Sequence, residues 1–153
     1  MLVFEDVILI SRGCNKLKDI IKQICDLQPF YSADNTPQMA ERGRLLRSEL
    51  KPFIESQKNI IAEALKEFGN DFCVEASDGI GRKTELPWVR FCSKKMSPSA
   101  TEGFYGVLHF STDGSAFHVT VGCGSSKFNN GTNVPLPDKE LAKQTEWARS
   151  III

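Results

Sequence analysis

Apolar positions in the second half of the chain alternate with polar or aromatic ones along three short runs, at residues 88–91, 104–110 and 117–121. Because successive side chains of a strand point to opposite faces, each run divides into two sets. One set is apolar throughout: Val89, Phe91, Phe104, Leu108, Phe110, Phe117, Val119 and Val121. The other set is mixed: Trp88, Arg90, Tyr105, Val107, His109, His118 and Thr120. The pattern predicts a sheet with a core face and a candidate working face, unless helices cover both faces and the second set is a less regular core.

The first half of the chain has the spacing of helices. Residues 1–10 are apolar and fit either a strand or a helix. Asn15 is a suitable N-cap for a helix that Pro29 stops, and Thr36 followed by Pro37 predicts the start of a second helix, interrupted at Pro52. The apolar positions of these two helices are Leu17, Ile20, Ile21, Ile24, Leu27, Leu45, Leu46 and Leu50. A third helix carries Phe53, Ile60, Ile61, Ala64, Leu65 and Phe68 and stops at Gly69 and Asn70.

Residues 122–137 are rich in Gly, Ser, Asn and Pro and predict a loop, after which Asp138 caps a closing helix. That helix places Leu141, Thr145, Ala148 and Ile152 on one side, with Trp147 adjacent. The predicted fold is therefore α+β, a mostly antiparallel sheet flanked by helices. A length of 153 residues suits one domain. We expect a helical part over residues 1–70, a sheet over 71–124, and a loop and helix over 125–153. The apolar end at 151–153 suggests a domain cut from a longer polypeptide.

The charge is balanced overall and uneven locally. Lys and Arg together number 19, as do Asp and Glu, so no global field indicates a nucleic-acid partner. Between residues 79 and 101, however, the sequence contains five basic residues and a single acidic one, Glu85. These are Arg82, Lys83, Arg90, Lys94 and Lys95. The cluster predicts contact with phosphates, and a solvated basic loop is the alternative.

The numbers and spacing of cysteines and histidines limit which disulfide, metal or catalytic sites the chain can form. The five cysteines are odd in number and widely spaced, which favours reduced thiols in a cytoplasmic protein. The two histidines have no spacing that would complete a zinc site, so we expect neither metal nor cofactor. No apolar run is long enough to cross a membrane. A small hydrolase could use Ser77 or a cysteine as nucleophile with His109 or His118 as base, but no nucleophile elbow and no suitably placed carboxylate accompanies them. The sequence therefore predicts that this segment has no catalytic residue.

The motifs in the sheet region follow a recognisable order. Ser77-Asp78-Gly79-Ile80-Gly81 precedes Leu86-Pro87-Trp88, and Gly103-Phe104-Tyr105 then opens a strand that ends at Phe110. Over roughly residues 72–124 this order resembles the N-terminal DNA-binding domain of the McrB-type modified-cytosine restriction proteins. The resemblance implies a module that binds double-stranded DNA and rotates a methylated or hydroxymethylated base of the cytosine class into an aromatic pocket. It also implies an effector module, a motor or a nuclease, in the same chain or in a partner.

The resemblance assigns roles to individual residues. Trp88, Tyr105 and His109 take the pocket positions. Gly79, Ile80 and Gly81 form the loop near the vacated stack, where Ile80 would act as a wedge. The family position of His109 is commonly aliphatic, so its imidazole points to a polar modification; a core histidine is the alternative. A protein-interaction module that binds a peptide on the same face is the alternative function.

Overall fold

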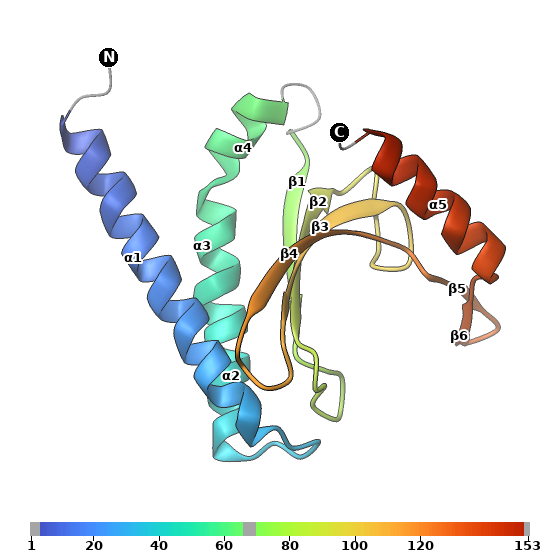
Figure 1. Cartoon of the computed structure of the whole chain (residues 1–153), viewed down its shortest axis with the longest axis horizontal. Coiled ribbons are helices and arrows are strands. Elements are labelled where there is room, and N and C mark those ends of the chain that lie inside the picture. Colours follow the sequence, from blue (N-terminus) through green and yellow to red (C-terminus); the bar gives the residue numbers. More distant parts are fainter. Residues whose placement is uncertain (1–3, 66–69, 152–153) are drawn as a thin grey trace.

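The computed structural model describes residues 4–65 and 70–151. The chain forms a helical half followed by a sheet and a closing helix, as Figure 1 shows. The helical half comprises α1 (Phe4–Leu27), η1 (Gln28–Phe30), α2 (Pro37–Arg44), η2 (Leu45–Leu50), α3 (Lys51–Ser56) and α4 (Lys58–Leu65). The rest comprises β1 (Phe72–Ser77), β2 (Trp88–Ser93), β3 (Phe104–Phe110), β4 (Phe117–Cys123), β5 (Ser126–Asn129), β6 (Thr132–Pro135) and α5 (Asp138–Ile151). The predicted α+β class is confirmed.

The main sheet has four strands in the order β1-β2-β3-β4, and every neighbouring pair is antiparallel. Helices α1 to α3 lie against one face of this sheet (Figure 1). The small β5-β6 hairpin and α5 lie beyond the other face. The helical layer therefore covers one side, and the central part of the opposite side stays open.

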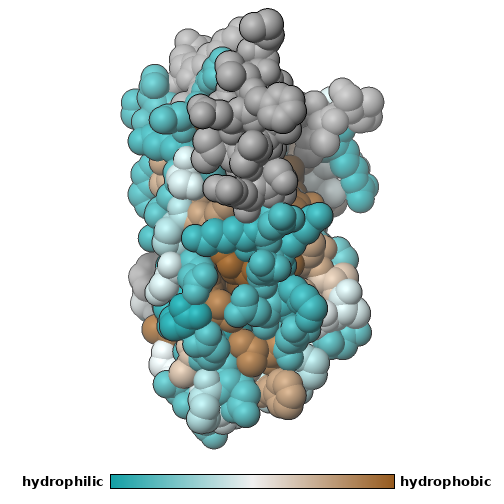
Figure 2. Space-filling model, turned by 90° about the vertical axis from the view of Figure 1, so that its left-hand side faces the viewer, coloured by the Kyte–Doolittle hydropathy of each residue, from teal (hydrophilic) through white to brown (hydrophobic). Residues whose placement is uncertain are grey.

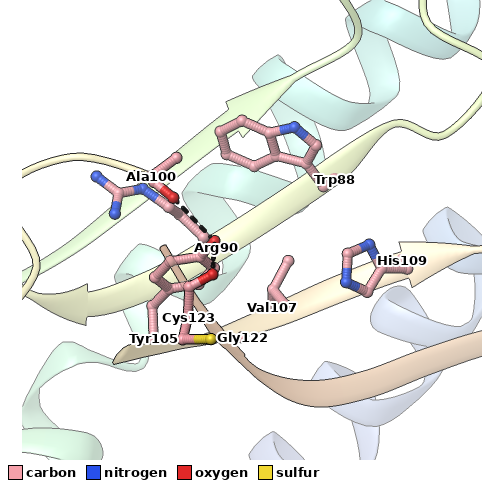
Figure 3. Close-up of a pocket in the computed structure, with 8 residues that line it drawn as sticks. All are labelled: Trp88, Arg90, Ala100, Tyr105, Val107, His109, Gly122 and Cys123. Carbon is pink, nitrogen blue, oxygen red and sulfur yellow. Dashed lines mark hydrogen bonds between the residues drawn. The ribbon is translucent and has the colours of Figure 1, made fainter. Parts of the chain in front are cut away.

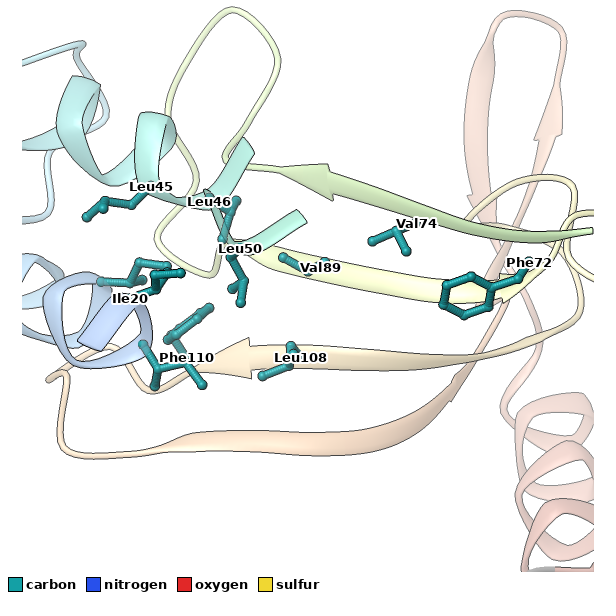
Figure 4. Packing of buried hydrophobic residues seen from close by; sticks show 11 residues of the cluster. Ile20, Leu45, Leu46, Leu50, Phe72, Val74, Val89, Leu108 and Phe110 are labelled. Carbon is teal, nitrogen blue, oxygen red and sulfur yellow. The ribbon is translucent and has the colours of Figure 1, made fainter. Parts of the chain in front are cut away.

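The core fills the space between the helices and the sheet (Figure 4). The helices contribute Ile20, Ile21, Ile24, Leu45, Leu46 and Leu50, and the sheet contributes Phe72, Val74, Val89, Leu108 and Phe110. Burying a side chain of this size stabilises the fold by roughly 1.5–3 kcal/mol relative to leaving it in water. The helical stripe predicted from residues 17–27 is confirmed, because its isoleucines are all buried.

The first helix begins earlier than predicted. Helix α1 runs without a break from Phe4 to Leu27, so the prediction that Asn15 caps its N-terminus is wrong. Apolar residues at 7, 10, 14, 17 and 21 keep a spacing of three or four, which extends the helical pattern through Asn15.

The second helix begins as predicted and does not stop where predicted. Thr36 Oγ1 accepts a hydrogen bond from the Met39 amide at 3.3 Å, and Pro37 occupies the first turn of α2. Pro52 was expected to interrupt the helix, but α2, η2 and α3 follow one another directly. The wider π-helical turn η2 precedes Pro52 and relieves the clash that a proline makes with the carbonyl one turn earlier. The third predicted helix is divided at Gln57 into α3 and α4, and its expected end at Gly69 lies outside the described residues.

The strand register confirms the two predicted faces. Val89 pairs with Leu108, and Leu108 pairs with Val119, which places all three on the helical side. Burial differs at the last strand, however. Phe117, Val119 and Val121 were expected in the core, but they are 44%, 62% and 54% exposed. The helical layer packs on the other three strands and leaves this side of β4 uncovered.

The predicted loop at residues 122–137 contains a hairpin, so that prediction is wrong. Strands β5 and β6 pair around Asn130 and Gly131, whose φ angles are 49° and 83°. Such left-handed pairs form the tight turns that connect hairpins, and Asn-Gly is their strongest sequence signal. The closing helix was predicted correctly from Asp138. Phe104, predicted for the core face, is not part of the core cluster and instead packs against Trp147 on α5, with 4.7 Å between ring centroids.

Candidate nucleic-acid interface

The open face of the sheet contains a pocket of about 290 Å³ (Figure 3). It is lined by Trp88, Arg90, Ala100, Tyr105, Val107, His109, Gly122 and Cys123. Binding sites for small molecules usually occupy roughly 300–1,000 Å³, so this volume suits one flat ring of modest size. All three residues predicted for the pocket, Trp88, Tyr105 and His109, line the same space.

Adjacent strands place the pocket side chains next to one another. Trp88 begins β2 and lies directly opposite His109 on β3, which in turn lies opposite His118 on β4. Side chains at directly opposed positions of an antiparallel pair are close enough to interact. An indole and an imidazole therefore border the same end of the pocket, and Val107 lies between them and Tyr105 (Figure 3).

Tyr105 is held in place from several sides. Its hydroxyl donates to the Ala100 carbonyl at 3.0 Å and lies 3.4 Å from the Cys123 carbonyl. The Arg90 guanidinium lies 5.4 Å from its ring centroid, within the range of a cation–π contact. Gly122 opposes Tyr105 on β4, and a Cβ there would lie 2.7 Å from the tyrosine ring. The ring position therefore depends on the absence of a side chain at Gly122.

Arg90 supports the pocket from within. It is fully buried, and its Nε donates to Glu75 Oε2 at 2.9 Å while its Nη1 donates to Ser97 Oγ at 2.9 Å. Burial alone would raise the pKa of Glu75, but hydrogen bonds from Arg90 and Lys94 outweigh it and lower that pKa. The carboxylate is thus kept charged, and the buried guanidinium keeps its counter-ion.

The pKa values of two pocket side chains, His109 and Tyr105, are shifted toward their neutral forms. Burial, assisted by the charge of His118, lowers the pKa of His109. The imidazole is therefore neutral at pH 7, with one nitrogen that donates and one that accepts. Burial raises the pKa of Tyr105, although the charge of Arg90 opposes the shift. The pocket thus offers aromatic faces together with a donor and an acceptor on His109.

The loop between β1 and β2 presents Ile80 to solvent. Ile80 is 98% exposed at the tip, between two glycines with left-handed φ angles of 111° and 76°. A Cβ at Gly79 would lie 2.1 Å from the Arg82 carbonyl oxygen, so this position requires glycine. The loop leads directly into Trp88 and lies at that end of the pocket.

Buried polar groups fix the base of this loop. Asp78 is buried and accepts from Lys83 Nζ at 2.6 Å and from Arg47. Buried Arg42 donates to the Thr84 carbonyl at 2.6 Å, and buried Gln28 donates to the Glu85 carbonyl at 3.2 Å. The helical half therefore holds the loop through charge-assisted hydrogen bonds, which leaves the exposed isoleucine on a firm base.

The five basic residues predicted for DNA contact lie in two kinds of surroundings. The side chains of Arg82, Lys94 and Lys95 are exposed; Arg82 lies in the loop before β2 and the two lysines follow β2. They therefore stand at both ends of the strand that carries Trp88. Lys83 is largely buried against Asp78, and Arg90 lies under Tyr105, so neither the ammonium nor the guanidinium is free at the surface. Lys94 is exposed but is paired with Glu75 Oε1 at 3.1 Å.

The described residues hold no group of three or more His, Cys, Asp or Glu side chains that could bind a metal ion. Within the same residues, no helix is long and apolar enough to cross a membrane. Cys25, Cys73, Cys92 and Cys123 carry free thiols.

The chain is similar to a known protein family over most of its length. Residues 27–153 match the family described as "MrcB-like, N-terminal domain", a range that extends from the end of α1 through α5. The chain belongs to this family. The MrcB-like N-terminal domain family fits a DNA-binding, non-catalytic role in restriction. No curated protein and no solved structure matches the chain.

The family match confirms the resemblance seen in the sequence, but several residues that hold the pocket and its loop in place were not predicted. The supporting roles of Arg90 and Asp78 were not predicted. A signal for the first was present, because Arg90 lies on the mixed face and pairs in register with Glu75. Gly122 was missed because its importance depends on the ring of Tyr105, which is distant in sequence.

Proposed function

We propose that this MrcB-like domain is the specificity module of a modification-dependent restriction or defence protein. In this proposal it binds double-stranded DNA and rotates a modified base of the cytosine class into the pocket of Trp88, Tyr105 and His109. The observation that carries the proposal is the pocket itself, which combines two aromatic side chains and a neutral imidazole on the open face of a DNA-binding domain.

The aromatic side chains of such a pocket offset most of the cost of extruding a base. Taking a base out of the stack costs a few kcal/mol, and each aromatic stacking contact returns roughly 1–3 kcal/mol. Two aromatics therefore bring the step close to balance. The remaining preference for a modified base must come from contacts to its edge and its substituent.

Ile80 is suited to fill the space that the base leaves. Apolar side chains inserted between base steps stabilise a disrupted stack. Ile80 is exposed, and its loop is anchored by buried Asp78 at the Trp88 end of the pocket. A wedge on a firm loop can act without first becoming ordered, which limits its entropic cost.

The DNA backbone would contact the exposed cations at both ends of β2. Arg82 lies on one side of the pocket, and Lys94 and Lys95 lie on the other. Phosphates on either side of the extruded nucleotide are the natural partners of such a pair of basic sites. In this proposal Lys83 holds the loop between β1 and β2, and Arg90 holds the ring of Tyr105.

His109 is proposed to select a polar substituent. Its neutral imidazole can donate to or accept from a hydroxymethyl group, which an aliphatic side chain could not do. A hydroxymethylated cytosine would therefore be preferred to a methylated one. The effector that acts after recognition, a motor or a nuclease, is proposed to lie in the same polypeptide or in a partner.

The test is equilibrium binding to three duplexes that differ only at one cytosine: unmodified, methylated and hydroxymethylated. We expect the modified duplexes to bind more tightly, with the hydroxymethylated one tightest. Equal affinity for all three would contradict base recognition while leaving DNA binding in place. Failure to bind any of them at low salt would remove the DNA role of the open face and leave it to a peptide partner.

A further inference from the structure

Strand β4 presents an uncovered apolar surface that base recognition does not use. Among the residues that the structure describes it is an edge strand, since it pairs there with β3 alone. Phe117, Val119 and Val121 lie on its helical side and are all at least two-fifths exposed. This surface, which we term the β4 stripe, is on the face opposite the pocket.

The edge lacks the features that usually prevent strand pairing. Natural edge strands carry charges, prolines or bulges that discourage another strand from adding to them. The segment Phe117–Cys123 has no Lys, Arg, Asp, Glu or Pro, and its pairing with β3 continues without a bulge from Phe117 to Cys123. The opposite edge, β1, carries Glu75 and lies beside α3 and η2. The two edges of the sheet therefore differ in their protection.

An apolar groove continues the β4 stripe onto α1. It has a volume of about 420 Å³ and is lined by Leu17, Lys18, Ile21, Lys22 and Phe117. Figure 2 shows this helical side, where hydrophobic surface emerges between the hydrophilic side chains. Lys22 is already paired with Asp26 at 2.6 Å, and Lys18 also lines the groove. Because Lys22 already has an acidic partner and the β4 stripe itself is apolar, the surface fits an apolar partner better than an acidic one.

We propose that the β4 stripe binds a second copy of this chain, by antiparallel pairing of the two β4 strands about Val119. The alternation is self-complementary, because a two-fold axis at Val119 places Phe117 opposite Val121 of the second copy and keeps all apolar side chains on one face. No like charges are directly opposed, since His118, the titratable side chain of the strand that faces the pocket side, would lie opposite Thr120 of the second copy. Val121 of the second copy would then lie next to Phe117 and could enter the groove beside α1.

This pairing extends the sheet and aligns the two open faces. A two-fold axis through paired edge strands is perpendicular to the sheet, so both pockets open on the same side. Neighbouring strands are roughly 4.8 Å apart, which places the two β3 strands about 14 Å from each other. The dimer itself does not depend on the proposed function, although the shared direction of the pockets would let both act on one DNA molecule.

The test is sedimentation velocity of the 153-residue chain, from low to high micromolar concentration, with Val119→Lys and the control Val134→Lys. Val134 is another half-exposed strand valine, on β6. We expect a reversible dimer that Val119→Lys weakens roughly tenfold or more, because two lysines would face each other, and that Val134→Lys leaves unchanged. A monomer at every concentration, or a dimer that survives Val119→Lys, would overturn the proposal.

A second variant tests the register directly. Oxidation of Val119→Cys should link the two copies through residue 119, since directly opposed strand positions bring Cβ atoms within roughly 4.5–5.5 Å. Peptide mapping identifies that bond among the natural cysteines, and Val134→Cys is the control. A cross-link that forms equally with both variants would contradict pairing about Val119.

Discussion

Trp88 and Trp147, the two tryptophans of the chain, provide a matched pair for testing the pocket. Trp88 lines the pocket, whereas Trp147 lies on α5 against Phe104 and away from it. We predict that Trp88→Ala weakens binding to modified duplexes by roughly 1–3 kcal/mol, the value of one stacking contact. Trp147→Ala should leave the preference for a modified base unchanged. Fluorescence anisotropy with both variants measures the difference.

Trp88→Phe separates stacking from folding in that experiment. Phenylalanine keeps an aromatic face, so this variant should retain more binding than Trp88→Ala. Equal losses in Trp88→Ala and Trp147→Ala, with both proteins folded by circular dichroism, would mean that Trp88 does not contact the base.

His109 is predicted to set the choice between modifications. Leucine at this position would leave a polar substituent buried without a partner, at a cost of roughly 1–3 kcal/mol. His109→Leu should therefore shift preference from hydroxymethylated to methylated cytosine. Competition binding gives the ratio, and Thr120→Leu is the control because Thr120 is an exposed side chain on the same face of β4, outside the pocket lining. An unchanged ratio in folded His109→Leu would exclude contact with the modification.

The limits of sequence reasoning at this scale are illustrated by Arg90. Its position on the mixed face and its cross-strand partner Glu75 were predictable in principle from alternation and register. Its complete burial depends on Ser97 and on the ring of Tyr105, which the fold brings from other segments. A count of basic residues cannot distinguish such a guanidinium from one that faces solvent.

At the scale of the elements, the β1-β2 loop is predicted to contribute to extrusion through its tip alone. Ile80→Ala should weaken binding to the modified duplex severalfold, because less apolar surface fills the vacated stack. Ile60→Ala is the control, since Ile60 is also exposed, on α4. Neither change should alter the urea midpoint, as neither side chain is in the core. Equal binding by Ile80→Ala and the native chain would rule out a wedge.

Helices and strands were predicted correctly where the local sequence pattern determines them, and were missed where their packing or backbone geometry does. Alternation gave β2, β3 and β4, and the Thr36-Pro37 cap gave the start of α2. The Asn130-Gly131 turn signal was present in the sequence, but the polar composition around it concealed the β5-β6 hairpin. The continuation of the helix through Pro52 depends on the π-helical turn before it, which periodicity does not reveal.

For the whole molecule, the distribution of charge predicts a shallow salt dependence. The net charge is zero, and Arg82, Lys94 and Lys95 are the members of the basic cluster with exposed side chains. Each phosphate contact contributes about 0.9 to the slope of log K against log salt concentration, so three contacts predict a slope of roughly −3. Titrations between roughly 50 and 200 mM salt measure it. A slope near zero would show that these residues do not contact the backbone.

The burial of the other two cations adds a control to that measurement. Replacing exposed Lys95 by Gln should reduce the slope by about one. Because Arg90 supports Tyr105 from a buried position, its replacement by Lys should weaken recognition of the modified base while changing the slope little. Equal changes of slope in both variants would contradict the assignment of Arg90 to the interior.

The most direct test of the central claim is the fluorescence of 2-aminopurine placed opposite or beside the modified cytosine in a bound duplex. This probe is quenched by stacking and brightens when its neighbours leave the helix. We predict that saturating protein raises its emission with a modified site, that Trp147→Ala retains the increase, and that Trp88→Ala reduces it. Unchanged emission at saturation, in a complex whose binding is confirmed by anisotropy, would contradict the claim that the pocket receives an extruded base.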